Sequence, residues 1–73
     1  MSDLRPVKHS LTLRGHRTSV SLEPEFWEAF RAAARDEGVP INELAARIDE
    51  GRGADRGLAS AIRVFVLRRL QAP

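Results

Sequence analysis

The chain has 73 residues, no cysteine and 42% hydrophobic residues. This composition is typical of a folded protein, it excludes disulfide bonds and thiolate metal sites, and no apolar run is long enough to span a membrane. The net charge of +2 is unevenly distributed, because residues 1–22 carry +3, residues 23–50 carry −5 and residues 51–73 carry +4. A basic N-terminal segment can direct one face toward a polyanion, or it can simply be a solvated surface.

A chain of this length buries only a small core, and such chains usually need disulfides, a metal or a partner subunit for stability. There is no cysteine, and the two histidines have no carboxylate cluster beside them. We therefore expect the stabilising partner to be a second copy of the chain. The N-terminus lacks an apolar signal region, so we also expect a cytoplasmic protein.

Residues 1–7 contain Pro6 and show no periodicity, which predicts a flexible N-terminal arm. Two alternating segments follow, "HSLTLRG" and "RTSVSLE", and alternation with a period of two indicates half-buried strands. A strand needs a partner for its backbone groups. That partner is either the first segment, joined through a turn at Gly15 and His16, or the same strand of a second subunit.

The second alternating segment has two distinct faces. We expect its apolar side to face the helices and its polar side to be exposed. The apolar side holds Thr18, Val20 and Leu22, and the polar side holds Arg17, Ser19 and Ser21.

Three amphipathic helices are expected in the rest of the chain. In "EPEFWEAFRAAARDEG", Pro24 suits the first helical position and Gly38 suits the C-terminal cap. "INELAARIDEG" ends at Gly51, and "EGRGADRG" reads as a loop. "LASAIRVFVLRRLQ" predicts a third helix at about 58–70, whose apolar face includes Leu70, and residues 71–73 form a tail.

The order of strand, helix, turn and helix in "RTSVSLEPEFWEAFRAAARDEGVPINELAARI" resembles the ribbon-helix-helix family of Arc- and MetJ-like DNA-binding proteins. "RGHRTSVSLEPEFWEAF", "INELAARID" and "SAIRVFVLRRL" are similar to a bacterial subfamily of small ribbon-helix-helix proteins. The resemblance covers residues 8–70. It implies a mostly α fold with one short β-strand, an intertwined homodimer with an intersubunit antiparallel ribbon, and an additional C-terminal helix.

The resemblance further implies that exposed ribbon side chains read base edges in the major groove of double-stranded DNA. The matching positions are Arg17, Ser19 and Ser21. An arginine fork suits guanine, and a serine hydroxyl bonds most bases. The competing interpretation is an ordinary solvated strand face, on which serine is common.

The backbone amides that begin the second helix would bind a DNA phosphate through the positive end of the helix dipole. The matching residues are Ile41 and Asn42, while Pro40 stands where the family usually has a Ser or Thr cap. Lys8, Arg14 and His16 are further candidate phosphate contacts, or else parts of a solvated arm.

The remaining apolar residues are expected in the core of the dimer. They are Val20, Leu22, Phe26, Trp27, Phe30, Leu44, Ile48, Ile62 and Phe65. The third helix could cover this core or recruit a further subunit into a higher oligomer. It could also be the family's second helix, with residues 41–57 as an insertion.

We therefore expect a bacterial transcriptional regulator that binds an operator as a homodimer, without a cofactor, a metal or a catalytic residue. Paired carboxylates, cysteine and tyrosine are missing, and neither histidine has a serine nucleophile beside it, so an enzyme is not expected. The alternative is an antitoxin-like dimer that binds a protein partner through its C-terminal helix.

Overall fold

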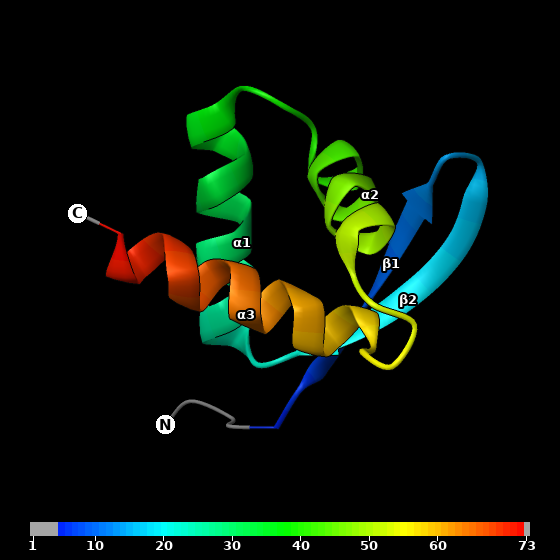
Figure 1. Cartoon of the computed structure of the whole chain (residues 1–73), viewed down its shortest axis with the longest axis horizontal. Helices are drawn as coiled ribbons and strands as arrows, with labels where there is room; N and C mark the ends of the chain where they lie inside the picture. Colours follow the sequence, from blue (N-terminus) through cyan, green and yellow to red (C-terminus); the bar gives the residue numbers. More distant parts are fainter. Residues whose placement is uncertain (1–4, 73) are drawn as a thin grey trace.

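The computed structural model describes residues 5–72 as a two-stranded ribbon followed by helices (Figure 1). The elements are β1 Val7–Leu13, β2 His16–Leu22, α1 Pro24–Glu37, α2 Ile41–Gly51 and α3 Leu58–Gln71. In Figure 1, α1 and α2 stand next to each other, α3 crosses in front of α1, and the ribbon runs along the side of α2. The expected ribbon, helices and additional C-terminal helix are thus confirmed.

The chain contributes two strands to the ribbon, which corrects the expectation of one short strand per chain. The whole of β1 pairs antiparallel with the whole of β2. Arg14 and Gly15 form the connecting turn with φ of 50° and 85°, and a two-residue hairpin turn favours such positive φ values. The turn therefore begins one residue before the expected Gly15-His16 pair. Within the chain, the first alternating segment supplies the strand that pairs with β2.

Local sequence signals account for both ends of α1. Pro24 occupies the first turn of α1, and Gly38 ends it in the left-handed conformation with φ 70°. The Gly38 N–H donates to the carbonyl oxygen of Arg35 at 3.1 Å, which satisfies one of the last free carbonyls. α2 follows Pro40 without a side-chain cap and includes Gly51 as its last residue.

The apolar core lies between the inner face of the ribbon and the three helices. Its buried members include Leu11, Leu13, Val20, Leu22, Phe30, Leu44, Ile62 and Val66, and Phe26, Trp27, Ile48 and Phe65 pack against them partly buried.

Two residues expected on apolar faces are exposed instead. Thr18 lies on the inner side of β2, but it lines a hollow with Asp49 and Leu58 and remains exposed. Leu70 is 71% exposed because the last turn of α3 projects past α1 (Figure 1).

Polar contacts attach α3 to the rest of the domain. The Arg63 guanidinium donates to the Glu23 carboxylate at 2.9 Å and lies 5.8 Å from the centre of the Phe26 ring. The hydrogen bond from Arg63 lowers the pKa of Glu23. Arg69 pairs with Asp36 on α1.

No helix within residues 5–72 combines the length and the apolar character that crossing a membrane requires.

Candidate nucleic-acid interface

The outer face of the ribbon is polar and carries positive charge only. The register places Lys8 opposite Ser21, Ser10 opposite Ser19, and Thr12 opposite Arg17, and all six are exposed. Neither strand contains an Asp or Glu residue. The face therefore presents four hydroxyl groups between two cations, and its small side chains leave the backbone close to the surface.

The two cations of this face, Lys8 and Arg17, have no polar side-chain contact within the described part of the chain. Within residues 5–72, neither Lys8 nor Arg17 forms an ion pair or a side-chain hydrogen bond. They lie toward opposite ends of the ribbon, since Lys8 is near the start of β1 and Arg17 is near the turn. Both charges are thus available to an anionic ligand along the length of the ribbon.

The inner face holds the ribbon against the helices. Val20 and Leu22 are buried in the core beneath the strand. The His9 ring stacks on the Trp27 indole of α1, with ring centroids 3.7 Å apart and planes 5° apart. Packing on this side fixes the orientation of Arg17, Ser19 and the other residues of the outer face.

Arg14, a candidate phosphate contact, is engaged with two carboxylates of α2. Its guanidinium lies 3.1 Å from Glu50 and 2.6 Å from Glu43. The hydrogen bonds to Glu50 and Glu43 raise the pKa of Arg14 above its ordinary value. Hydrogen bonds from Arg14 and Arg47 lower the pKa of Glu43. A phosphate would have to compete with these carboxylates for Arg14, which here fastens the ribbon turn to α2.

The start of α2 lies beside the ribbon. The Thr12 N–H donates to Asn42 Oδ1 at 3.1 Å, so the Asn42 side chain covers part of the free edge of β1. The backbone N–H groups of Ile41 and Asn42 donate to no acceptor in the described part of the chain, as is usual in a first helical turn. Pro40 precedes them in extended conformation and supplies no side-chain cap. The geometry brings these amides near the ribbon but leaves the Asn42 side chain engaged.

His16 does not share a face with Arg17. It is the first residue of β2 and alternates with Arg17, on the side of Thr18 and Val20. It is exposed and lines the shallow hollow that also includes Asp49 and Arg52.

Sequence reasoning named neither Ser10 nor Thr12 as part of the interface. Their place on the outer face follows from the pairing of β1 with β2, which brings them opposite Ser19 and Arg17. The signal was present in "HSLTL", where Leu11 and Leu13 alternate with hydroxyl residues.

A family model described as a ribbon-helix-helix domain matches residues 6–70. The chain belongs to the ribbon-helix-helix family. Ribbon-helix-helix proteins are generally DNA-binding regulators that typically bind as dimers, and the fold is a non-enzymatic one. Comparison with curated proteins and comparison with solved structures each gave no significant match.

Proposed function

We propose that the protein is a sequence-specific regulator of transcription that inserts its ribbon into the major groove of double-stranded DNA. The observation that carries the proposal is the outer face of the ribbon. Among residues 5–72, Lys8 and Arg17 have no ion-pair partner, and neither strand contains a carboxylate. The major groove admits a two-stranded ribbon, and adjacent strands lie only about 5 Å apart.

Base contacts are assigned to Arg17, Ser19 and Ser21. An unpaired arginine can offer two parallel hydrogen bonds to guanine O6 and N7, and serine hydroxyls both donate and accept. Ser10 and Thr12 lie across the ribbon from two of these residues and would contact the same bases or their neighbours.

Phosphate contacts are assigned to Lys8, to His16 and to the free amides of Ile41 and Asn42. Lys8 lies on the outer face at the open end of the ribbon, and the amides lie beside Thr12. His16 lies next to the turn, on the opposite face of the ribbon. Helix-terminal amides favour anions through their dipole. Arg14 is a weaker candidate, because Glu43 and Glu50 already hold it.

We further propose that the acting species is a homodimer. Two leucines of α3 lie outside the core, since Leu67 is 52% exposed and Leu70 is 71% exposed. Exposed apolar side chains that lie close together on one helix are typical of a surface that contacts another protein. A two-fold dimer would present two ribbons to DNA. One chain measures up to 36 Å across, which is compatible with half-sites about 34 Å, or one helical turn, apart.

Selection of bound fragments from a random DNA pool tests the function. We expect enrichment of an inverted repeat whose half-sites are about 10 base pairs apart, with affinity that falls steeply as salt rises. Failure to enrich any sequence at low salt would refute specific DNA binding. Enrichment of a single site without symmetry would refute the dimer and leave the ribbon assignment standing.

A further inference from the structure

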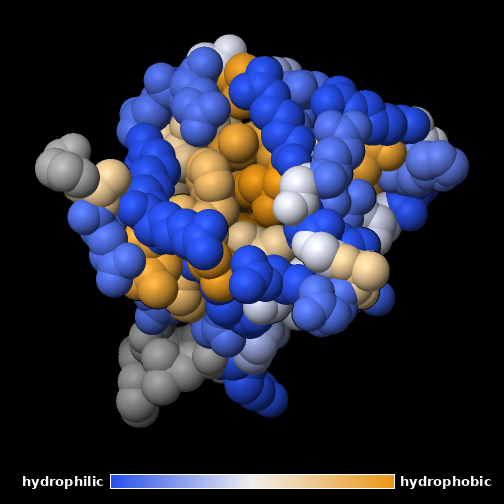
Figure 2. All heavy atoms as spheres, viewed as in Figure 1, coloured by the Kyte–Doolittle hydropathy of each residue, from blue (hydrophilic) through white to orange (hydrophobic). Residues whose placement is uncertain are grey.

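A second surface lies on the helical side of the molecule, apart from the ribbon. Figure 2 shows apolar atoms at the bottom of a hollow in this face, ringed by hydrophilic residues. The hollow is a groove of about 400 Å³ between α2 and α3, closed at one end by Glu37 of α1. Every residue that lines it belongs to a helix or to the loop between α2 and α3, so the groove is separate from the outer face of the ribbon.

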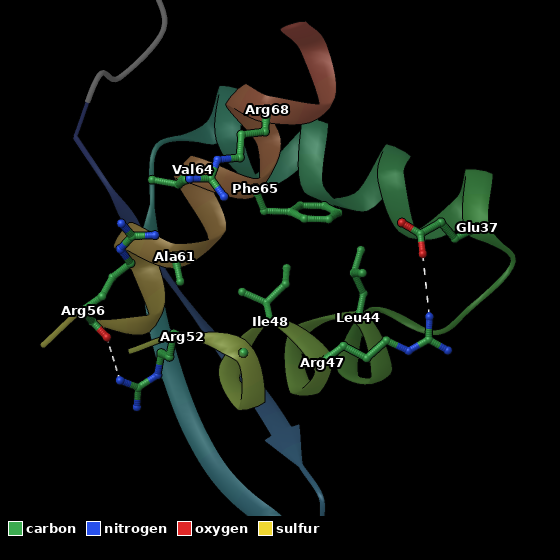
Figure 3. Close-up of a pocket in the computed structure, with 11 residues that line it drawn as sticks. Glu37, Leu44, Arg47, Ile48, Arg52, Arg56, Ala61, Val64, Phe65 and Arg68 are labelled. Carbon is green, nitrogen blue, oxygen red and sulfur yellow. Dashed lines mark hydrogen bonds and ion pairs between the residues drawn. The ribbon is translucent and has the colours of Figure 1, made fainter. Parts of the chain in front are cut away.

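The floor of the groove is apolar and open. Leu44 and Ile48 point into it from α2, and Ala61 and Phe65 approach them from α3 (Figure 3). Ile48, Val64 and Phe65 are only partly buried, because no element within the described residues 5–72 covers this side of them. Covering them with apolar groups would be favourable, since it removes apolar surface from water.

The rim of the groove is strongly basic. It consists of Arg47, Arg52, Arg56 and Arg68, with Glu37 as the single acidic residue.

Two of these arginines are already paired, and two are not. Arg47 contacts Glu43 at 2.9 Å, and Arg52 contacts Asp49 at 2.7 Å. Within residues 5–72, Arg56 and Arg68 have no carboxylate partner. The rim therefore retains two positive charges beside an apolar floor.

We propose that this groove binds an acidic amphipathic helix of a partner protein. Apolar side chains at i, i+3 or i+4, and i+7 would fill the floor, in the mode by which helices bind apolar grooves. Carboxylates on either side of that stripe would pair with Arg56 and Arg68. The same groove of a second copy is a poor occupant, because a two-fold contact between identical patches would place arginine against arginine.

A library of helical peptides tests the proposal against the full chain. Leucines are fixed at helical spacing, and the flanking positions are randomised among Glu, Lys and Ser. We expect the retained peptides to prefer Glu over Lys at these positions. The double variant Arg56→Glu/Arg68→Glu should weaken their binding about tenfold or more, since it reverses both unpaired charges.

A matched control separates local from general charge effects. Arg35→Glu changes an exposed arginine of α1 that does not line the groove, and it should alter peptide affinity less than about twofold. The sedimenting mass of the double variant is measured as well, because it reports whether the substitutions change the oligomeric state.

Several outcomes would overturn the proposal: retention of no peptide, absence of a preference for Glu, or equal binding by the double variant. A change in the sedimenting mass of the double variant would also overturn it, because the occupant would then be a second copy of the chain.

Discussion

Arg14 and Arg17 stand three residues apart in the hairpin, yet their surroundings give them different roles. Arg14 lies in the turn, where two carboxylates of α2 hold it. Arg17 lies on the outer face of β2, where the described residues offer it no acidic partner. The first arginine is a structural contact, and the second is free to contact a ligand.

We predict that Arg17→Ala weakens specific DNA binding without unfolding the protein. Loss of a bidentate base contact costs about 1–3 kcal/mol, or roughly 5- to 140-fold in Kd. Fluorescence anisotropy with a selected operator measures the change, and thermal unfolding checks the fold. Arg35→Ala is the control, because Arg35 is also exposed and also has no ion-pair partner among residues 5–72. Equal effects of the two variants would show that Arg17 contributes only general charge.

We predict that Glu43 contributes to stability only above acidic pH. Hydrogen bonds from Arg14 and Arg47 lower its pKa from the ordinary 4.5, so folding favours the charged carboxylate. This contribution is fully present above about pH 4.5 and is lost as the pH falls through the lower pKa of the folded state.

Urea unfolding of wild type and Glu43→Gln at about pH 7 and about pH 3 checks this prediction. The fluorescence of Trp27, the one tryptophan, reports unfolding. Wild type should be the more stable protein at the higher pH, and the difference should narrow at the lower pH. A difference that is independent of pH would contradict the assigned role of Glu43.

At the scale of the elements, the hairpin turn decides how the ribbon forms. Arg14 and Gly15 both adopt positive φ, and this allows β1 to fold back on β2. A Cβ atom added to Gly15 would meet no other atom within 4 Å. Glycine is therefore favoured here because it adopts positive φ easily, and not because the site is closely packed.

We predict that Gly15→Ala destabilises the fold by about 1 kcal/mol, because an L-residue is strained at φ +85°. Gly51→Ala is the matched substitution, since Gly51 ends α2 without positive φ and also has open space around it. It should stabilise the fold by about 0.5–1 kcal/mol. Urea denaturation measures both, and a stabilising Gly15→Ala would contradict the turn assignment.

At the scale of the whole molecule, one core joins all five elements. Leu22, Phe30 and Ile62 are its largest completely buried side chains, and they come from β2, α1 and α3. Burying each such side chain contributes about 1.5–3 kcal/mol, which is a large share of the stability of so small a domain. Leu67 and Leu70 remain outside this core.

We predict that the protein self-associates through the exposed side of α3. The melting temperature should then rise with protein concentration, because association stabilises the folded state by mass action. The double variant Leu67→Asn/Leu70→Asn should sediment with a lower mass than wild type at equal concentration. A wild type that remains monomeric at high concentration would refute the proposed dimer.

The sequence by itself determined the local features of this protein. The bounds of α1 follow from Pro24 and Gly38, and the two faces of β2 follow from alternation, since both signals act between near neighbours. The family and the ribbon-helix-helix order were also readable, because the combined motifs span nearly the whole chain.

Only the tertiary structure decided which distant residues meet. Alternation indicated a strand but could not choose between β1 and a second chain as its partner, since both offer the same backbone groups. Glu50 lies 36 residues beyond Arg14, so their ion pair depends on how α2 packs against the turn. The basic rim of the groove likewise arises because the packing of α3 beside α2 brings Arg47 and Arg52 to the same groove as Arg68. Such contacts depend on three-dimensional packing, and sequence periodicity carries no information about them.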